Sequence, residues 1–178
     1  MSLQIRDDAR LAGQVIRYHT WPHLRQQSVG EHSWQVARII MSISTERYWA
    51  KLLPHAITHD IGEIGTGDVP YPVKKNNPEL SAMFHALEQE TMNEIENKWQ
   101  LYTGTALTDQ ERWVFKLAEF IEMWEWGLEE TLRGNKFAEK VVERCIAVVV
   151  QMLEMAMDES VKIRAEEYVM TRQKEWGQ

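Results

Sequence analysis

The chain has 178 residues and a formal net charge of −7, with 44% hydrophobic and 26% charged residues. These values are ordinary for a globular protein, and the acidic balance argues against a general nucleic-acid binder, which needs a basic surface. The single cysteine, Cys145, excludes an internal disulfide and a zinc site built from several thiolates, and its apolar neighbours predict a buried, unreactive thiol.

Apolar residues recur at helical spacing along most of the chain, and no convincing alternating strand pattern is present. Ser28 and Thr108 are each followed three residues later by glutamate, which is a capping-box pattern at a helix start. The sequence therefore predicts an all-α fold, a single helical bundle over residues 1–178. The expected helices cover residues 3–18, 30–47, 49–61, 78–100, 109–132, 136–158 and 160–175.

The predicted helices are interrupted by one conspicuous loop region and one clear stop. Residues 60–78 contain three glycines and three prolines, and Gly134-Asn135 is typical of a helix end. The longest apolar runs fall short of the roughly 18 residues that a membrane span needs, and no signal pattern opens the chain. We therefore expect a cytoplasmic protein, in the host cytoplasm if it is encoded by a phage.

The most informative local feature is His59-Asp60, directly before the loop region. Glu63 follows one helical turn after Asp60, and Asp68 lies a few residues further on, beyond a glycine-rich bend. Such a density of metal ligands and carboxylates around one bend is hard to explain as surface decoration. It predicts a site for a divalent metal ion, with carboxylates placed to transfer protons.

Further ligands are available on two other predicted helices. His32 lies just inside the helix that Ser28 caps, and Glu119 shares a helix face with Glu122 in an apolar, tryptophan-rich segment. A carboxylate in such surroundings is costly to bury unless it is paired or bound to a metal. The composition alone leaves other readings open, because a His-Asp dipeptide is common by chance and His55, four residues before His59, is a rival ligand.

Four ordered motifs make the sequence resemble the 5′-deoxynucleotidase branch of the HD-domain phosphohydrolase superfamily, and also the phage dATP triphosphohydrolases. The motifs run in order over most of the chain, between Arg17 and Glu130. They are Arg17 with Trp21-Pro22, Ser28-Val29-Gly30-Glu31-His32-Ser33, His59-Asp60-Ile61-Gly62-Glu63, and Thr66-Gly67-Asp68-Val69-Pro70-Tyr71-Pro72-Val73-Lys74.

This resemblance implies a role for each matched residue. His32, His59 and Asp60 match three metal ligands, and Glu119 takes the place of the aspartate that is the family's fourth ligand. By the same resemblance, Glu63 and Asp68 match the family's acid–base carboxylates. Arg17 and Trp21 match residues that line the deoxynucleoside pocket, and Lys74 matches a basic residue that meets the phosphate. The family's tryptophan crowds the sugar and disfavours a 2′-hydroxyl.

The implied activity is metal-dependent hydrolysis of deoxynucleotides, and we expect dATP, split into deoxyadenosine and triphosphate, as the substrate. The implied metal is Co²⁺, Mn²⁺ or Zn²⁺ at the HD site, with Mg²⁺ accompanying the substrate phosphates. We expect a homo-oligomer, a dimer or larger, without a membrane or nucleic-acid polymer as partner. The alternatives are a 5′-deoxynucleotidase acting on monophosphates, a different HD reaction such as cyclic-nucleotide or alarmone hydrolysis, and an inactive nucleotide-binding scaffold.

Overall fold

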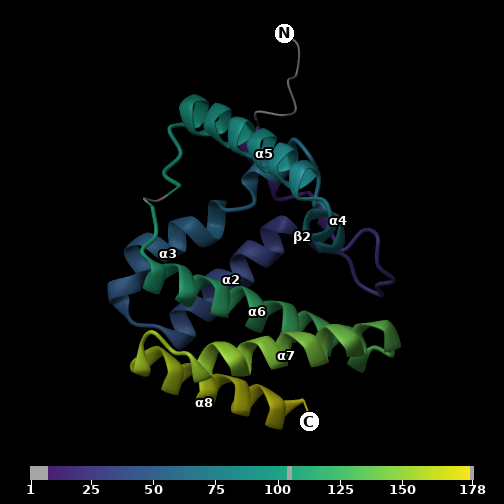
Figure 1. The fold of residues 1–178 in the computed structure, drawn as a ribbon, viewed down its shortest axis with the longest axis vertical. Helices are drawn as coiled ribbons and strands as arrows, with labels where there is room; N and C mark the ends of the chain where they lie inside the picture. Colours follow the sequence, from purple (N-terminus) through teal and green to yellow (C-terminus); the bar gives the residue numbers. More distant parts are fainter. Residues whose placement is uncertain (1–7, 104–105, 177–178) are drawn as a thin grey trace. The chain divides into compact units, whose positions relative to one another are not determined.

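The computed structural model describes residues 8–103 and 106–176, and it confirms the all-α prediction. Helices account for most of this part of the chain, and a two-stranded antiparallel sheet is the β-structure found in it (Figure 1). None of the described helices is long and apolar enough to cross a membrane. The chain divides into two compact units, whose described residues are 8–22, 26–33 and 57–103 in the first unit and 23–25, 34–56 and 106–176 in the second.

The predicted helix at 3–18 is wrong over most of its described length. Helix α1 covers only Ala9–Ala12, because the Asp8 side chain accepts the Arg10 amide at its start and the backbone turns after Ala12. Ile16–Arg17 then form strand β1, which pairs antiparallel with strand β2, Gln27–Ser28. Long-range backbone pairing therefore outweighs the helical spacing of the apolar residues, and residues 3–7 lie outside the described part.

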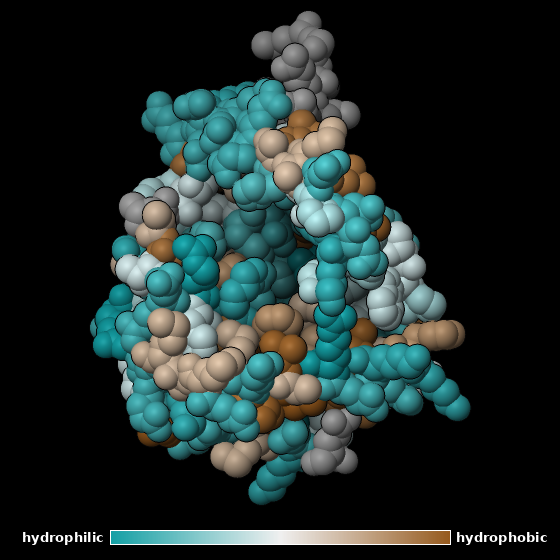
Figure 2. All heavy atoms as spheres, viewed as in Figure 1, coloured by the Kyte–Doolittle hydropathy of each residue, from teal (hydrophilic) through white to brown (hydrophobic). Residues whose placement is uncertain are grey.

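The remaining elements of the first unit surround the glycine-rich region. They are the 3₁₀ helix η2 (Ile61–Ile64), helix α4 (Tyr71–Asn76) and helix α5 (Pro78–Trp99). Helix α4 was not predicted, although Pro72 near its start is a favourable first-turn residue. A small apolar cluster of Ala12, Ile61 and Ile95 joins α1, η2 and α5. Thr91 and Ile95 are the buried residues of α5, and the face of this helix seen in Figure 2 is mainly hydrophilic.

The second unit contains the larger hydrophobic core. It is built from most of helix α2 (Val29–Ile43) and helix α3 (Glu46–Thr58), together with α6 (Asp109–Leu132), α7 (Glu139–Glu154) and α8 (Glu159–Glu175). The short 3₁₀ helix η3 (Lys136–Ala138) precedes α7, which packs along α6 (Figure 1). The core includes Ile39, Ile121, Trp124 and Val149, and Cys145 is buried as predicted, with a thiol pKa raised to about 11 by burial.

Both predicted caps are formed. Ser28 Oγ accepts the Glu31 amide at 3.2 Å, and Thr108 makes a complete capping box with Glu111. Helix α6 ends at Leu132, directly before the predicted stop, where Gly134 has a positive φ of 98°. These local signals fix the starts of α2 and α6 and the end of α6.

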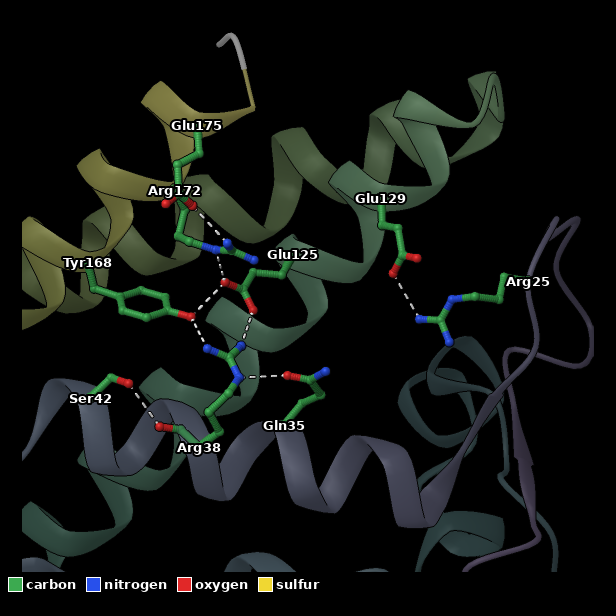
Figure 3. A network of polar contacts seen from close by, with 9 residues as sticks. All are labelled: Arg25, Gln35, Arg38, Ser42, Glu125, Glu129, Tyr168, Arg172 and Glu175. Carbon is green, nitrogen blue, oxygen red and sulfur yellow. Dashed lines mark hydrogen bonds and ion pairs between the residues drawn. The ribbon is translucent and has the colours of Figure 1, made fainter.

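One carboxylate, Glu125 of α6, ties α8 to the rest of the second unit. It accepts hydrogen bonds from Arg38 Nη2 at 2.6 Å, Tyr168 Oη at 2.7 Å and Arg172 Nε at 2.7 Å (Figure 3). The Glu125 carboxylate is almost buried, and two guanidinium groups compensate its charge.

Candidate functional site

The candidate site is built around the turn between α3 and η2. His59 and Asp60 form this turn, and Asp60 stands at the start of η2 without using its side chain as a cap. Gly62 allows the turn to lie tightly against α5, since a Cβ at this position would be 2.4 Å from the Glu88 carbonyl oxygen. The close packing of η2 on α5 therefore fixes the backbone directly after the His59–Asp60 turn.

His32 reaches the same turn from the first residues of α2. Its ring centroid is 5.4 Å from that of His59, and ring nitrogens of the two histidines lie within 4.8 Å of each other. Asp60 Oδ2 is 3.1 Å from His59 Nε2 and 3.8 Å from His32 Nε2. Ligands of a tetrahedral zinc ion are roughly 3.3 Å apart, so these three donor atoms have the spacing and the chemistry of a divalent-metal site.

Arg17 brings a positive charge to this cluster. Its Nη1 is 3.0 Å from Asp60 Oδ2, and its side chain is largely buried. Burial alone would raise the pKa of Asp60, but His59, Arg17 and His32 outweigh it and hold that pKa well below its ordinary range. Asp60 is therefore an ionised carboxylate, as a metal ligand has to be.

Glu63 behaves in the opposite way, although it is only one turn from Asp60. It is 6% exposed, and its Oε2 has no hydrogen-bond partner among the described residues. Burial and the nearby carboxylates of Asp60 and Asp68 raise the pKa of Glu63 to about 9, against the smaller opposing effect of Arg17 and Lys74. At neutral pH this structure therefore holds a proton on Glu63, next to a carboxylate that is ionised.

Asp68 and Trp21 belong to the segments that border this cluster. The Tyr18 amide donates to Asp68 Oδ2 at 3.0 Å, so the residue after strand β1 is tied to the segment that follows η2. Tyr18 has a positive φ of 55°, and the Trp21 amide donates to the Tyr18 carbonyl at 2.9 Å in the tight turn that follows. Trp21 is 39% exposed.

The partner that holds Lys74 could not be predicted from the sequence. Glu88 of α5 lies 3.4 Å from Lys74 Nζ, and Thr66 Oγ1 is at the same distance from the Glu88 carboxylate. Glu88 is one of several polar residues on an exposed helix, and only the packing of α5 against η2 and α4 singles it out. Glu88 thus orients Lys74, the lysine of α4 that belongs to the fourth sequence motif.

Two residues considered from the sequence belong to the second unit. Glu119 lies on α6, where its carboxylate is 2.5 Å from Lys116 Nζ, and its role as a metal ligand stays a prediction. His55, the rival ligand, packs edge-on against Phe115 with ring centroids 4.6 Å apart. This contact gives His55 a packing role in the core of that unit.

Comparison with known proteins identifies the class. The family described as YfbR-like 5′-deoxynucleotidases matches residues 10–169. A 5′-deoxynucleotidase of Vibrio atlanticus (strain LGP32) is 30% identical over 159 residues, covering 78% of this chain and 81% of the relative. The 5′-deoxynucleotidase YfbR of Escherichia coli O1:K1 / APEC is 28% identical over 135 residues, covering 65% of this chain and 68% of the relative.

Solved structures agree with the fold. The cyanophage S-2L HD phosphohydrolase DatZ, solved with dA and one catalytic Zn²⁺ ion, superimposes with a TM-score of 0.73 at 18% identity, over 98% of both chains. An HD-domain phosphohydrolase from Listeria innocua gives a TM-score of 0.69 at 20% identity, over 93% of this chain and 86% of the other. The fold is thus that of HD phosphohydrolases.

The chain is therefore an enzyme with the fold of the HD-domain phosphohydrolases. It belongs to the YfbR-like 5′-deoxynucleotidase family, which confirms the resemblance drawn from its motifs.

Proposed function

We propose that this enzyme hydrolyses the 5′-phosphoester of deoxynucleotides and releases a deoxynucleoside. The observation that carries the proposal is the convergence of His32, His59 and the ionised Asp60 beside a buried, protonated Glu63. Two imidazoles and a carboxylate suit a borderline divalent ion, and a carboxylic acid one turn away suits proton transfer. We further propose that the chain acts as one HD domain and as a homo-oligomer, as the family resemblance implies.

The ion would be Co²⁺, Mn²⁺ or Zn²⁺, held by His32, His59 and Asp60. Glu119 is the fourth ligand by family resemblance alone. When bound, such an ion supplies Lewis-acid polarisation of the phosphoryl group. The Arg17 guanidinium, 3.0 Å from the Asp60 carboxylate, would supply a positive charge beside the phosphoryl group.

Glu63 and Asp68 divide the proton transfers. A water oxygen forms a new bond to phosphorus while the bond from phosphorus to the 5′-oxygen breaks. Glu63 gives its proton to the departing 5′-oxygen. Asp68, whose negative charge helps to raise the pKa of Glu63, accepts the proton of the attacking water. Trp21 contacts the sugar and Lys74 the phosphate, in keeping with their matched motif positions.

Deoxynucleoside monophosphates are the first candidate substrates. The support for them is that both sequence relatives are named as 5′-deoxynucleotidases. A second candidate is dATP, converted to deoxyadenosine and triphosphate with Mg²⁺ on the phosphates. It is favoured by the match over nearly the whole chain to DatZ, which was solved with dA. The two candidates share the bond that is broken and differ in the phosphate chain.

The decisive experiment is a screen of the four deoxynucleoside monophosphates, the four triphosphates and AMP and ATP, each with Co²⁺, Mn²⁺ or Zn²⁺, with products separated by chromatography. We expect a deoxynucleoside as the product and the ribonucleotides to react much more slowly. Trp21→Ala is expected to narrow the difference between dAMP and AMP while the metal stays bound. Equal rates on dAMP and AMP would contradict the assignment of Trp21, and a triphosphate product would select the dATP reaction.

A further inference from the structure

Within the first unit, Lys74 of α4 is paired with a carboxylate of the adjacent helix α5. Its Nζ lies 3.4 Å from Glu88 Oε1, and Thr66 Oγ1 lies at the same distance from that oxygen. The side chain of Glu88 is 18% exposed and that of Lys74 is 31% exposed, so water screens the pair only in part. The Lys74 ammonium group therefore presents a partly neutralised charge.

The backbone of Glu88 is fixed against η2, the element that carries Glu63. A Cβ on Gly62 would lie 2.4 Å from the Glu88 carbonyl oxygen, so η2 and α5 meet backbone to backbone at this point. The same residue thus joins the two elements through its main chain and faces Lys74 through its side chain. Its carboxylate is a negative charge held at one place in the first unit.

Lys74 and Arg17 are two cations that act on the same acid. Both oppose the rise in the pKa of Glu63 that burial and the carboxylates of Asp60 and Asp68 produce. Arg17 Nη1 is itself 3.0 Å from Asp60 Oδ2. Because each of the two cations is matched by a carboxylate of its own unit, together they offer an anion less than two full positive charges.

We propose that Glu88 determines which phosphate chain the site accepts: by neutralising Lys74, it favours a deoxynucleoside monophosphate over a triphosphate. The inference rests on the proposed function, in which Lys74 contacts the substrate phosphate. A triphosphate carries more negative charge than a monophosphate, so it loses more from a fixed carboxylate beside the cation that binds it. Glu88 acts on the substrate through its charge and takes no part in breaking the phosphoester bond.

The test compares Glu88→Gln with Glu90→Gln, which removes the same charge from an exposed position of the same helix. Two residues along a helix is a rotation of about 200°, so Glu90 lies on a different face from Glu88. For each protein kcat/KM is measured on dAMP and on dATP with excess Mg²⁺, at low salt and in about 0.5 M KCl, where charges are strongly screened. A nucleotide that is not turned over is measured as an inhibitor of the other. Metal content and helical content are the controls.

In Glu88→Gln we expect the dATP-to-dAMP ratio of kcat/KM, or of affinity, to rise by about threefold to tenfold at low salt, and the rise to shrink in KCl. Glu90→Gln is expected to stay within about twofold of the wild type, because a distant exposed charge is screened. Lys74→Met is the second variant, which is informative even if Glu88→Gln does not fold. It leaves the Glu88 carboxylate without this cation, so the same ratio should fall.

The outcomes separate this inference from the proposed function. An unchanged ratio in Glu88→Gln or in Lys74→Met would overturn the role of Glu88. A rise that persists undiminished in KCl, or that Glu90→Gln reproduces, would overturn it as well, because the effect would then not come from the local charge. A wild type inactive on every deoxynucleotide, with its metal bound, would instead overturn the proposed function, and the role of Glu88 with it.

Discussion

At the scale of single residues, the site separates two carboxylic acids by their surroundings. Asp60 is surrounded by His59, Arg17 and His32 and stays ionised, whereas Glu63 is buried near two other carboxylates and keeps its proton. Environments that push neighbouring pKa values apart are how enzymes assign acid and base roles to chemically similar groups. The pair therefore offers one residue suited to binding a cation and one suited to donating a proton.

Glu63→Gln is expected to keep the metal and to lower turnover by about 10²–10⁴-fold, the usual contribution of general acid–base catalysis. The amide has nearly the same shape but no proton to give to the leaving oxygen. Turnover and metal content would be measured on the same preparations. Glu90→Gln, at an exposed position of α5, is the matched control and should behave like the wild type. Loss of the metal together with activity would instead make Glu63 a ligand.

Asp60→Ala is expected to lose both the metal and hydrolysis, because it removes the oxygen that lies near both histidine nitrogens. His59→Ala should behave in the same way, and helical content by circular dichroism should change little. Metal content by mass spectrometry provides the measurement. Asp68→Asn is the contrasting variant, since its carboxylate binds the Tyr18 amide, and it should retain the ion. Full activity of Asp60→Ala after chelation and readdition of metal would rule out the site.

At the scale of elements, the site depends on how closely the 3₁₀ helix η2 approaches α5. The contact is backbone against backbone at Gly62 and Glu88, so no side-chain movement can relieve a larger residue there. The same approach brings Glu88 to Lys74 and Thr66. The short element η2, which follows the His59–Asp60 turn, is thus placed by a longer helix from further along the chain.

Gly62→Ala is therefore expected to destabilise the protein by about 1–3 kcal/mol, the usual cost of overpacking, and to weaken metal affinity. Its added Cβ would lie 2.4 Å from the Glu88 carbonyl oxygen, which forces η2 to shift. Urea unfolding and metal titration would measure the two effects. Gly13→Ala is the control, because its added Cβ would come no closer than 3.7 Å to any of its neighbours. Equal tolerance of both substitutions would contradict the packing argument.

At the scale of the whole molecule, the chain is acidic, with a net charge of −7, so an anionic substrate would have to meet locally placed cations under the proposed function. Arg17 and Lys74 are both held by carboxylates of the same unit, Asp60 and Glu88. Stability also depends on charge, because Glu130 is buried and ionised. Burial alone would raise its pKa, but the hydrogen bonds from Asn135 and from the amides of Leu24 and Arg25 outweigh burial and lower it.

The lowered pKa of Glu130 determines whether stability rises or falls with pH. The contribution of ionised Glu130 is present above the ordinary glutamate value of 4.5 and is lost as the pH falls below it, through the lower pKa of the folded state. Urea unfolding should show wild type more stable than Glu130→Gln by about 1–3 kcal/mol at neutral pH, with the difference shrinking in acid. A stability difference independent of pH would show that the charge of Glu130 adds nothing to its hydrogen bonds with Leu24, Arg25 and Asn135.

Local signals in the sequence determined much of this protein. The capping residues Ser28 and Thr108 and the stop at Gly134 act over a few residues, so helix boundaries near them were predicted closely. Four ordered motifs identified the family, and the one around His59 combines histidine, carboxylates and glycines within a short segment. The failed helix at 3–18 marks the limit, since the pairing of β1 with β2 is a long-range interaction that no local spacing reveals.

Only the tertiary structure decided which distant side chains meet. His32 joins His59 and Asp60 because the start of α2 is folded against the turn after α3, and Arg17 joins them through the β1–β2 pairing. Glu88 and Glu130 acquire their hydrogen-bond partners in the same way, although in the sequence they are two acidic residues among 27. A side chain's hydrogen-bond partner and pKa depend on burial and on neighbours remote in sequence, and folding alone supplies both.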